Sequence, residues 1–308
     1  MKLEKEPEGP PHPYSKSTVV VLLVVHLGAL LAPFFYSPSA VALALLLYSL
    51  NCLGITTGYH RLLTHRSFKA KRWLGRLLVS LGALSAQAGP ATWVAIHRMH
   101  HAKSDKAEDP HDASRGFWWA HMGWMLRVTP RRLDPNFTRR FARDVLEDPY
   151  FAFLDKAFFP ICLLSGVVVF FLGGWSWVFW GMFLRIAAVF HATWLVNSAA
   201  HMFGYRTYPT QDLSTNCWWV ALVTFGEGWH NNHHAFPTSA RHGRRWWEVD
   251  LSWMLILFLA RCGWVWDINA GKSQQFVQNF ASAAGTGLGV ARDQRADQLN
   301  QAGSEIGA

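Results

Sequence analysis

The chain has 308 residues, 51% of them hydrophobic, and a formal net charge of +9. This length can bury a sizeable core, and the positive charge comes without a nucleic-acid-binding motif, which makes nucleic acid a poor candidate for a partner. The four cysteines contain no CxxC pair, so no disulfide framework is predicted. The hydrophobic residues gather in long, nearly uncharged stretches, and this distribution indicates a membrane protein.

Four of these stretches are long enough for a helix to cross a bilayer, which takes about 20 apolar residues. They form two pairs, joined by turns near residues 32–39 and 173–176, and neither turn carries a Lys or Arg. The sequence therefore predicts an all-α integral membrane protein with four transmembrane helices arranged as two hairpins. The predicted spans cover residues 17–36, 39–58, 158–177 and 180–200.

The positive charges predict the orientation of these spans. More than half of the 29 Lys and Arg lie in residues 59–157, between the hairpins, and more follow residue 200. By the positive-inside rule, these segments and both termini face the cytoplasm. Such a basic face attracts anionic lipid headgroups and would also suit an acidic redox partner. A shorter apolar segment, residues 251–266, is expected at the membrane interface.

Both ends of the chain are polar and contain few residues that could form a core. We expect residues 1–15 to be a disordered N-terminal tail and residues 269–308 to be a disordered C-terminal tail rich in Gly, Ala and Gln. One membrane domain, residues 16–268, is predicted between them.

The stretch AIHRMHHAKSDKAEDPH, from Ala95 to His111, places three histidines within five residues. The spacing H-x-x-H-H occurs again in HNNHH, and two further motifs, HRLLTH and NSAAH, lie where the second and fourth predicted spans end. All four motifs fall on the predicted cytoplasmic side of the membrane. They contain nine of the 15 histidines, namely His60, His65, His97, His100, His101, His201, His230, His233 and His234.

Residues at positions i, i+3 and i+4 share one face of a helix, and neutral imidazoles are good ligands for transition metals. Nine such ligands are too many for one ion and suit two. His60 and His65 are five residues apart, so their rings diverge on a regular helix and can converge only where the helix ends or loosens. The set predicts a dinuclear site for iron, zinc, copper or nickel.

Acidic residues near these motifs are candidates for orienting the metal-bound rings, because such imidazoles usually donate their second N–H to a carboxylate. Asp105, Asp109 and Glu227 are the candidates, although each could equally be a solvated surface charge. Supporting or structural roles are expected for the further histidines His26, His111, His121, His191 and His242.

Five motifs resemble, in the same order, those of the membrane-bound fatty acyl desaturases of the Δ9, stearoyl-CoA desaturase type: HRLLTH, HRMHH, DPHDASRGFWWAHMGWML, NSAAHMFGYR and GEGWHNNHHAFP. The resemblance covers roughly residues 20–265 and is closest to bacterial and cyanobacterial members. It implies a mushroom-like fold, with four membrane helices as the stem and a cytosolic helical cap that holds a diiron centre. It also implies that the nine histidines bind two Fe ions, that Asn197 reaches one of them through water, and that zinc could replace iron in recombinant material.

The resemblance further implies a bent substrate tunnel. Trp93 and Thr193 match residues that shape the bend beside the metals, and Gln87 lies next to them. Trp194 matches another wall residue, and Tyr48 matches a residue near the closed end of the tunnel. Without the resemblance, Tyr48 would be interpreted as an ordinary membrane tyrosine.

The expected function is O2-dependent insertion of a cis double bond, at Δ9, into a saturated C16 or C18 acyl chain, with two electrons from an external donor such as ferredoxin, rubredoxin or cytochrome b5. Ala88 and Ala95 stand where the animal enzymes place an Asn and an Arg against coenzyme A, so the carrier is left open among coenzyme A, acyl carrier protein and glycerolipid. A hydroxylase of the same superfamily is the nearest alternative. A membrane metal transporter or sensor is a further alternative, but it would favour more polar groups within the spans.

Overall fold

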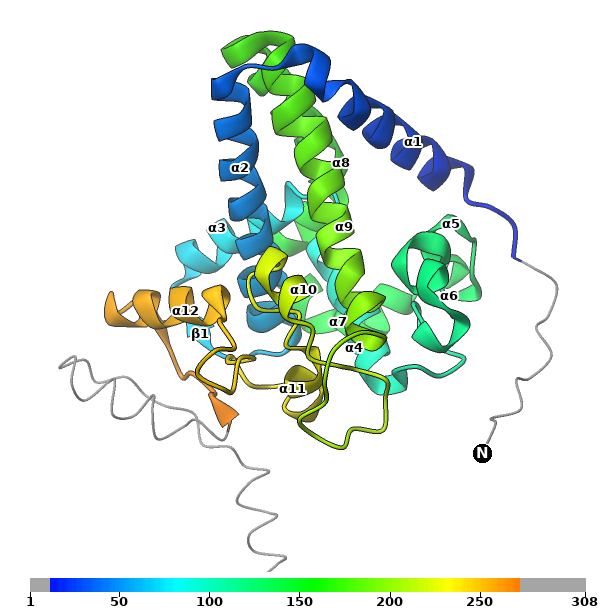
Figure 1. Cartoon of the computed structure of the whole chain (residues 1–308), viewed down its shortest axis with the longest axis vertical. Helices are drawn as coiled ribbons and strands as arrows, with labels where there is room; N and C mark the ends of the chain where they lie inside the picture. Colours follow the sequence, from blue (N-terminus) through cyan, green and yellow to red (C-terminus); the bar gives the residue numbers. More distant parts are fainter. Residues whose placement is uncertain (1–11, 272–308) are drawn as a thin grey trace, which may run out of the picture.

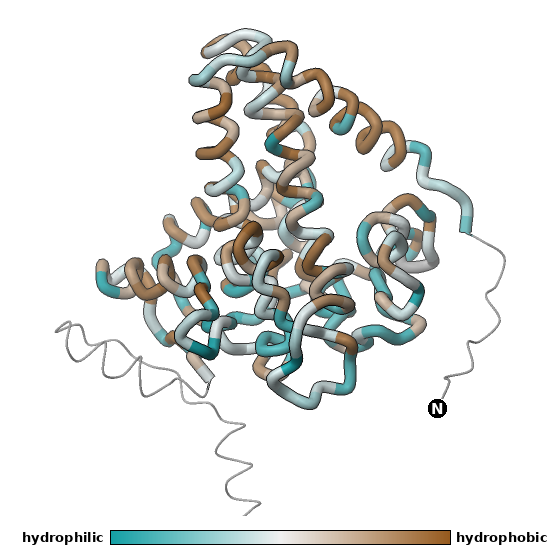
Figure 2. Tube along the Cα trace, in the orientation of Figure 1, coloured by the Kyte–Doolittle hydropathy of each residue, from teal (hydrophilic) through white to brown (hydrophobic). Residues whose placement is uncertain are grey.

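The structure, a computed structural model, describes residues 12–271. Its described part is mainly helical, with long helices forming a stem above a broad cap of shorter helices (Figure 1). The stem is the more hydrophobic part (Figure 2). Three helical stretches are long and apolar enough to cross a membrane: Lys16–Phe35, Pro38–Thr64 and Pro149–His201.

The first two stretches are separated at Ser37. Helix α1 (Lys16–Leu31) continues into the short helix η1 (Ala32–Phe35), and α2 (Pro38–Leu53) follows. Ser37 caps α2 by accepting a hydrogen bond from the Ala40 N–H at 3.2 Å, and proline at the first helical position fits because it has no N–H to leave unpaired. The break therefore falls inside the predicted turn. Figure 1 shows α1 sloping away from α2 and α8 as it descends from the top of the stem.

The third stretch contains α8 (Pro149–Val178), η5 (Phe179–Leu184), α9 (Arg185–Asn197) and η6 (Ala199–His201). It is interrupted at Gly174, whose φ of +64° suits glycine because it has no Cβ. The arms before and after Gly174 pack together, since Gly166 lies directly against Met182. The interruption lies where the sequence predicts the second turn. Helix α8 starts before the predicted span because Asp148 caps it, accepting from the Tyr150 N–H at 2.8 Å.

The cap is built from short helices that connect and surround the lower ends of the stem. Its largest packed pair is α4 with α7, which bury Val94, Ala95, Phe137 and Val145 against one another. The only sheet in the described range pairs β1 (Lys69–Ala70) with β2 (Val265–Trp266) in antiparallel register. The cap helices are α3 (Arg72–Ala83), α4 (Pro90–Lys103), η3 (Ala113–Arg115), η4 (Trp119–Gly123), α5 (Trp124–Leu126), α6 (Pro130–Leu133), α7 (Phe137–Leu146), α10 (Trp218–Val223), α11 (His230–Ala235) and α12 (Leu251–Arg261).

The lower end of α2 continues as η2 (Gly54–Thr64), a π-helix that packs closely on α3. A Cβ at Gly58 would lie 2.9 Å from the backbone of Leu78, and one at Gly54 would meet the backbone of Gly82. Only glycine allows this approach, which fixes the position of the first histidine motif against the cap.

Backbone hydrogen bonds tie the innermost residues of both predicted tails to the rest of the described structure. Ser15 donates its backbone N–H to the Leu126 carbonyl at 2.8 Å, and the Val128 N–H binds the Pro13 carbonyl at 2.8 Å, so the residues just before α1 are held by the cap. At the other end, the Asn269 N–H binds the Ser67 carbonyl at 2.8 Å. These segments are ordered because neighbouring loops supply the backbone partners that a free tail lacks. The rest of the predicted tails, residues 1–11 and 272–308, lies outside the described residues.

Candidate functional site

The nine histidines of the four motifs lie in two adjoining groups of buried or half-buried rings. The first group consists of His60, His65, His97, His101 and His233, and the second of His100, His201, His230 and His234. Within each group the Nε2 atoms converge. They lie 3.1 Å apart between His60 and His65, for example, and 3.1 Å apart between His230 and His234. A metal bound at about 2.1 Å holds neighbouring ligand nitrogens about 3 Å apart, so each group has the spacing of a metal coordination shell.

The π-helical segment η2 explains how His60 and His65 meet. A π-helix makes i→i+5 hydrogen bonds, and the His65 N–H binds the His60 carbonyl at 3.1 Å. Five residues are then nearer to one full turn than they are in an α-helix, and the two Nε2 atoms converge to 3.1 Å. The prediction that these rings require a loosened helix is confirmed.

Both H-x-x-H-H motifs contribute to both groups. In α4, His97 and His101 face the first group while His100 faces the second. In α11 the arrangement is reversed, because His230 and His234 face the second group while His233 faces the first. The two groups therefore share α4 and α11 as common walls and lie side by side.

Four rings donate their outer N–H to a carboxylate. His100 Nδ1 lies 2.8 Å from Asp109, His201 Nδ1 lies 3.0 Å from Asp105, and His60 Nδ1 lies 2.5 Å from Glu227. These are the three acids that the sequence offered as orienting partners. A proton held on Nδ1 leaves the Nε2 lone pair free for a metal.

The fourth carboxylate, Asp212, was not identified from the sequence. Its Oδ2 accepts from His234 Nδ1 at 2.9 Å, and its Oδ1 accepts from the Ser214 N–H at 3.0 Å. Asp212 lies in a loop, 22 residues before His234. Because a loop has no helical periodicity, no spacing pattern in the sequence could have linked this acid to that histidine. His111 supports the same region, since its ring centroid lies 4.2 Å from that of His100 and its backbone N–H donates to Asp109 at 3.1 Å.

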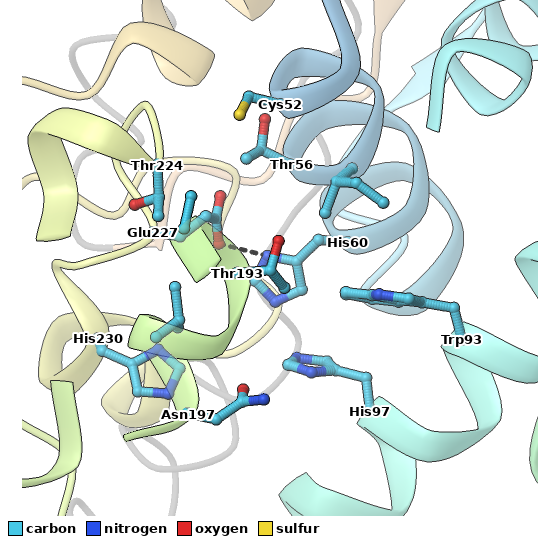
Figure 3. A pocket seen from close by; sticks show the side chains of 13 residues that line it. Cys52, Thr56, His60, Trp93, His97, Thr193, Asn197, Thr224, Glu227 and His230 are labelled. Carbon is cyan, nitrogen blue, oxygen red and sulfur yellow. Dashed lines mark ion pairs between the residues drawn. The ribbon is translucent and has the colours of Figure 1, made fainter. Parts of the chain in front are cut away.

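Two cavities meet beside the histidines. The larger, of about 520 Å³, reaches α1, α4, α7, α8 and α9, and the smaller, of about 40 Å³, lies between η2, α9 and the segment before α11. Trp93, His97, Thr193 and Asn197 line both, so the two cavities adjoin at these residues. Figure 3 shows His60, His97 and Asn197 at the smaller cavity, with Trp93 and Thr193 beside them.

Four of the five predicted tunnel residues line these cavities. Gln87 donates to the Thr193 hydroxyl at 2.9 Å, and the residues on either side of Gln87, Ala86 and Ala88, both have positive φ, at +59° and +81°. Backbone strain of this kind is found where a side chain must be held in a set direction. Trp93 stacks on His97 with ring centroids 5.1 Å apart, and Trp194 lines the larger cavity.

The fifth predicted tunnel residue, Tyr48, does not line either cavity. Cys52 and Thr224 line the smaller cavity, and Tyr48 lies one helical turn before Cys52. Its hydroxyl donates to the Val223 carbonyl at 2.6 Å. The structure thus places Tyr48 beside Val223 and outside the lining of both cavities.

Comparison with known proteins identifies the family. The model of the fatty acid desaturase family matches residues 32–253. The sn-1 stearoyl-lipid 9-desaturase of Anabaena variabilis is 52% identical, over 82% of this chain and 93% of its own length. The enzyme with the same name from a Synechocystis species is 50% identical, over 79% of this chain and 77% of its own. Delta-9 acyl-lipid desaturase 1 of Arabidopsis thaliana is 40% identical, over 82% of this chain and 83% of its own.

The chain belongs to the fatty acid desaturase family. The family predicted from the histidine motifs is confirmed, and so is the class of enzyme, a fatty acyl desaturase. The hydroxylase and transporter alternatives are not favoured. A hydrocarbon C–H bond offers no acidity to a side chain, so this activity needs an oxidising cofactor. Apolar helices and histidines in a metal-binding arrangement fit that requirement.

The electrostatics of the desaturase keep its ring nitrogens available for metal. Burial, and then the neighbouring imidazoles, lower the pKa of His97, His101 and His233 well below the ordinary value, so these rings are neutral at neutral pH. Burial alone would raise the pKa of Asp109, but the adjacent His100 outweighs it and the pKa falls, which keeps the carboxylate charged.

Arg61 is the main feature of the desaturase site that sequence reasoning missed. Its guanidinium is fully buried and donates to Glu227 at 2.9 Å, to Asp250 at 3.1 Å and to the Ala240 carbonyl at 2.8 Å. Gly226 has φ of +118°, and a Cβ there would meet Asp250, so the chain needs glycine to bring Glu227 to this arginine. The signal was present in HRLLTH, where an arginine directly follows a histidine at the end of an apolar span.

Proposed function

We propose that this desaturase inserts a cis double bond at Δ9 of a C16 or C18 acyl chain carried by a membrane glycerolipid. The observation that carries the proposal is the cavity, which passes apolar side chains of α8 and α9 and then His97 and Asn197. An acyl chain lying in it would bring one methylene pair to the histidine groups. Burial of a long chain, at about 0.8 kcal/mol per CH₂, is sufficient to hold it there.

In this proposal the nine histidines hold two iron ions, and Asn197 reaches one of them through a water molecule. Imidazole ligands at this spacing fit such a centre, as do the carboxylates that hold His60, His100, His201 and His234. The diiron centre would supply the oxidising chemistry with O2. The net change consumes one O2, two electrons and two protons with two substrate hydrogens, and yields two waters and the alkene.

The protein's own side chains would place the substrate. The hydrogen bond between Gln87 and Thr193 and the stacked pair of Trp93 and His97 form a rigid corner where the two cavities adjoin. A saturated acyl chain that bends at this corner would end near Cys52, which lines the smaller cavity. The number of carbons between the corner and that end would then be constant, so the same carbons would be presented at every turnover. Exclusion of water by the apolar walls would protect the reaction from side products.

A glycerolipid carrier is supported by the names of the relatives and by the cavity. The sn-1 stearoyl-lipid 9-desaturases are about half identical to this chain. The large cavity is lined by Val21 and Leu22 of α1 and by Phe158 and Phe159 of α8, all within stretches apolar enough to lie in a membrane. Ala88, which also lines it, offers no polar side chain to a coenzyme A arm.

The proposed orientation follows from charge. We propose four spans, with the 149–201 stretch crossing twice through its break at Gly174, and with the cap and both termini in the cytoplasm. The Lys and Arg of residues 59–157 would then face the cytoplasm, as the positive-inside rule requires. An acidic external donor, such as a ferredoxin, a rubredoxin or cytochrome b5, would find a basic surface there.

Expression in a desaturase-deficient host tests the proposal. Extracted lipids should contain new cis Δ9 fatty acids, and the purified iron-loaded protein with a reductant should convert vesicle-bound stearoyl glycerolipid in preference to stearoyl-CoA. A hydroxylated product would contradict the reaction. Rapid turnover of stearoyl-CoA with no turnover of the lipid would contradict the carrier.

A further inference from the structure

Three histidines outside the two groups form a continuous polar chain from α1 to the end of α9. His26 Nδ1 lies 2.6 Å from the Leu22 carbonyl, and His26 Nε2 lies 3.1 Å from His191 Nε2. His191 Nδ1 lies 3.0 Å from His121 Nε2, and His121 Nδ1 lies 2.9 Å from the Ser198 hydroxyl. The sequence offered only separate structural roles for these rings. The structure joins them across α1, α9 and η4.

This chain of histidines lies along one wall of the larger cavity. The indole of Trp194 lies 6.4 Å from the His26 ring, 5.1 Å from the His191 ring and 5.6 Å from the His121 ring, measured between centroids. Trp194 and Leu22 both line the larger cavity. The same polar chain therefore holds a cavity-lining indole of α9 and a cavity-lining turn of α1.

The chain has one hydrogen too few for its contacts. It ends at two carbonyls, since the Ser198 hydroxyl also lies 2.8 Å from the Trp194 carbonyl, and a carbonyl can only accept. Five contacts need five hydrogens, but three neutral imidazoles and one hydroxyl supply four. One contact of the neutral chain must bring two lone pairs together instead of a donor and an acceptor.

The His121 ring is neutral at neutral pH. Burial, and then the neighbouring His191, lower the pKa of His121 to about 4. In its all-neutral form this chain of rings connects α1 to α9 through five contacts, one of which lacks a hydrogen, so it can open at modest cost. Elsewhere this part of α1 is held by apolar contacts, with Leu22 and Val25 packed on Ile186 and Phe190.

We propose that the chain from His26 through His191 and His121 to Ser198 is the clasp of a lateral entrance, which holds α1 and Trp194 in place around the cavity and opens to admit a lipid-linked acyl chain. The entrance lies between α1 and α8, whose residues line the same cavity. An acyl chain attached to a bilayer lipid can enter there without leaving the membrane. The choice of a lipid-linked substrate rests on the proposed function; the clasp itself rests on the contacts above.

The first test measures the opening without any substrate. In a Cys262→Ser background, which removes the one exposed cysteine of the described residues, Leu22→Cys would place a thiol on the cavity wall. Labelling by a membrane-soluble maleimide should become about tenfold faster when His191→Leu is added, because two hydrogen bonds are lost. The double variant His26→Gln with His191→Gln should restore slow labelling, because each amide carries both a donor and an acceptor and the two can therefore hydrogen-bond to each other. Ser165→Ala, which removes a hydroxyl bonded only within α8, is the matched control.

The second test uses substrate. His191→Leu should keep its metal content and should accept a methyl-branched stearoyl lipid about tenfold better, relative to the linear lipid, than the wild-type enzyme does. Unchanged labelling in His191→Leu, or equally fast labelling in the glutamine pair, would overturn the clasp. If the wild-type protein desaturates no lipid at all, the proposed function fails while the labelling result still decides the clasp.

Discussion

His60 Nδ1 lies 2.5 Å from Glu227 Oε2. Arg61, the residue after His60, donates to the other oxygen of Glu227, although the two residues are 166 positions apart in the sequence. Two consecutive residues of η2 thus hold one carboxylate from both sides. Arg61 keeps Glu227 charged, and Glu227 fixes the proton of His60 on Nδ1. This arrangement leaves the Nε2 of His60 unprotonated and directed toward the other rings of the first group.

Removal of Arg61 should therefore destabilise the protein. Arg61→Met leaves Glu227 and Asp250 buried without their cation, which should lower the free energy of unfolding by about 3–5 kcal/mol. Denaturant unfolding of the metal-free protein in detergent would measure this change. Arg61→Lys retains the charge but not the two-pronged hydrogen bonding, and an intermediate stability is expected. Equal stability of Arg61→Met and wild type would show that the buried pair contributes nothing.

Single ligand replacements should separate the two groups. His97→Ala removes a ring from the first group and His234→Ala removes one from the second, so each should lose about one metal ion per chain and nearly all activity. Metal analysis of the purified variants gives the stoichiometry. His12→Ala, which changes a ring outside both groups, is the control. Full metal content together with normal turnover in either variant would remove that residue from the ligand set.

Asp212 should matter as much as the acids that the sequence identified. Asp212→Asn keeps the shape but weakens the hold on the His234 N–H, and metal affinity should fall by about 10–100-fold. Competition with a chelator of known affinity measures this loss. Asp267→Asn, on an acid that is paired with Lys69 and lines neither cavity, serves for comparison. Unaltered affinity in Asp212→Asn would reduce the acid to a loop-folding role.

Metal retention should extend to mildly acidic pH. The pKa values of His97, His101 and His233 lie below that of a free imidazole, so protons compete for their lone pairs only well below pH 6.5. Metal content after dialysis should stay constant from about pH 7.5 to about pH 6. In the metal-free protein the unfolded state binds more protons, so this part of the stability is present above about pH 6.5 and is lost as the pH falls below it. Half-loss of metal near pH 6.5 would contradict the lowered pKa values.

The inner end of the cavity should set chain length. Cys52→Phe should fill the space that Cys52 and Thr224 now line and shift the products from C18:1 toward C16:1. Tyr48→Gly should open space behind Cys52 and favour longer chains, while Tyr48→Trp should favour shorter ones. Fatty acid analysis of the expressing host gives the ratios. Ser49→Ala, next to Tyr48 but bonded only within its own helix, is the control, and constant ratios in all of the cavity variants would place the end of the acyl chain elsewhere.

The sequence by itself determined the apolar stretches, the breaks near Ser37 and Gly174, and the nine histidines that form the groups. These properties depend on composition and on spacing along one helix, which local chemistry sets. The loosened helix between His60 and His65 was also predictable, because only that geometry lets rings five residues apart converge.

Only the tertiary structure decided how the histidines divide, with His100 turned away from His97 and His101 toward rings of other segments. It also decided that Asp212 and Arg61 belong to the site and that His26, His191 and His121 form one chain. Each of these depends on which side chains meet across segments far apart in the sequence. These contacts are set by how the surfaces of whole helices pack against one another, and the residue spacing within a single segment does not determine them.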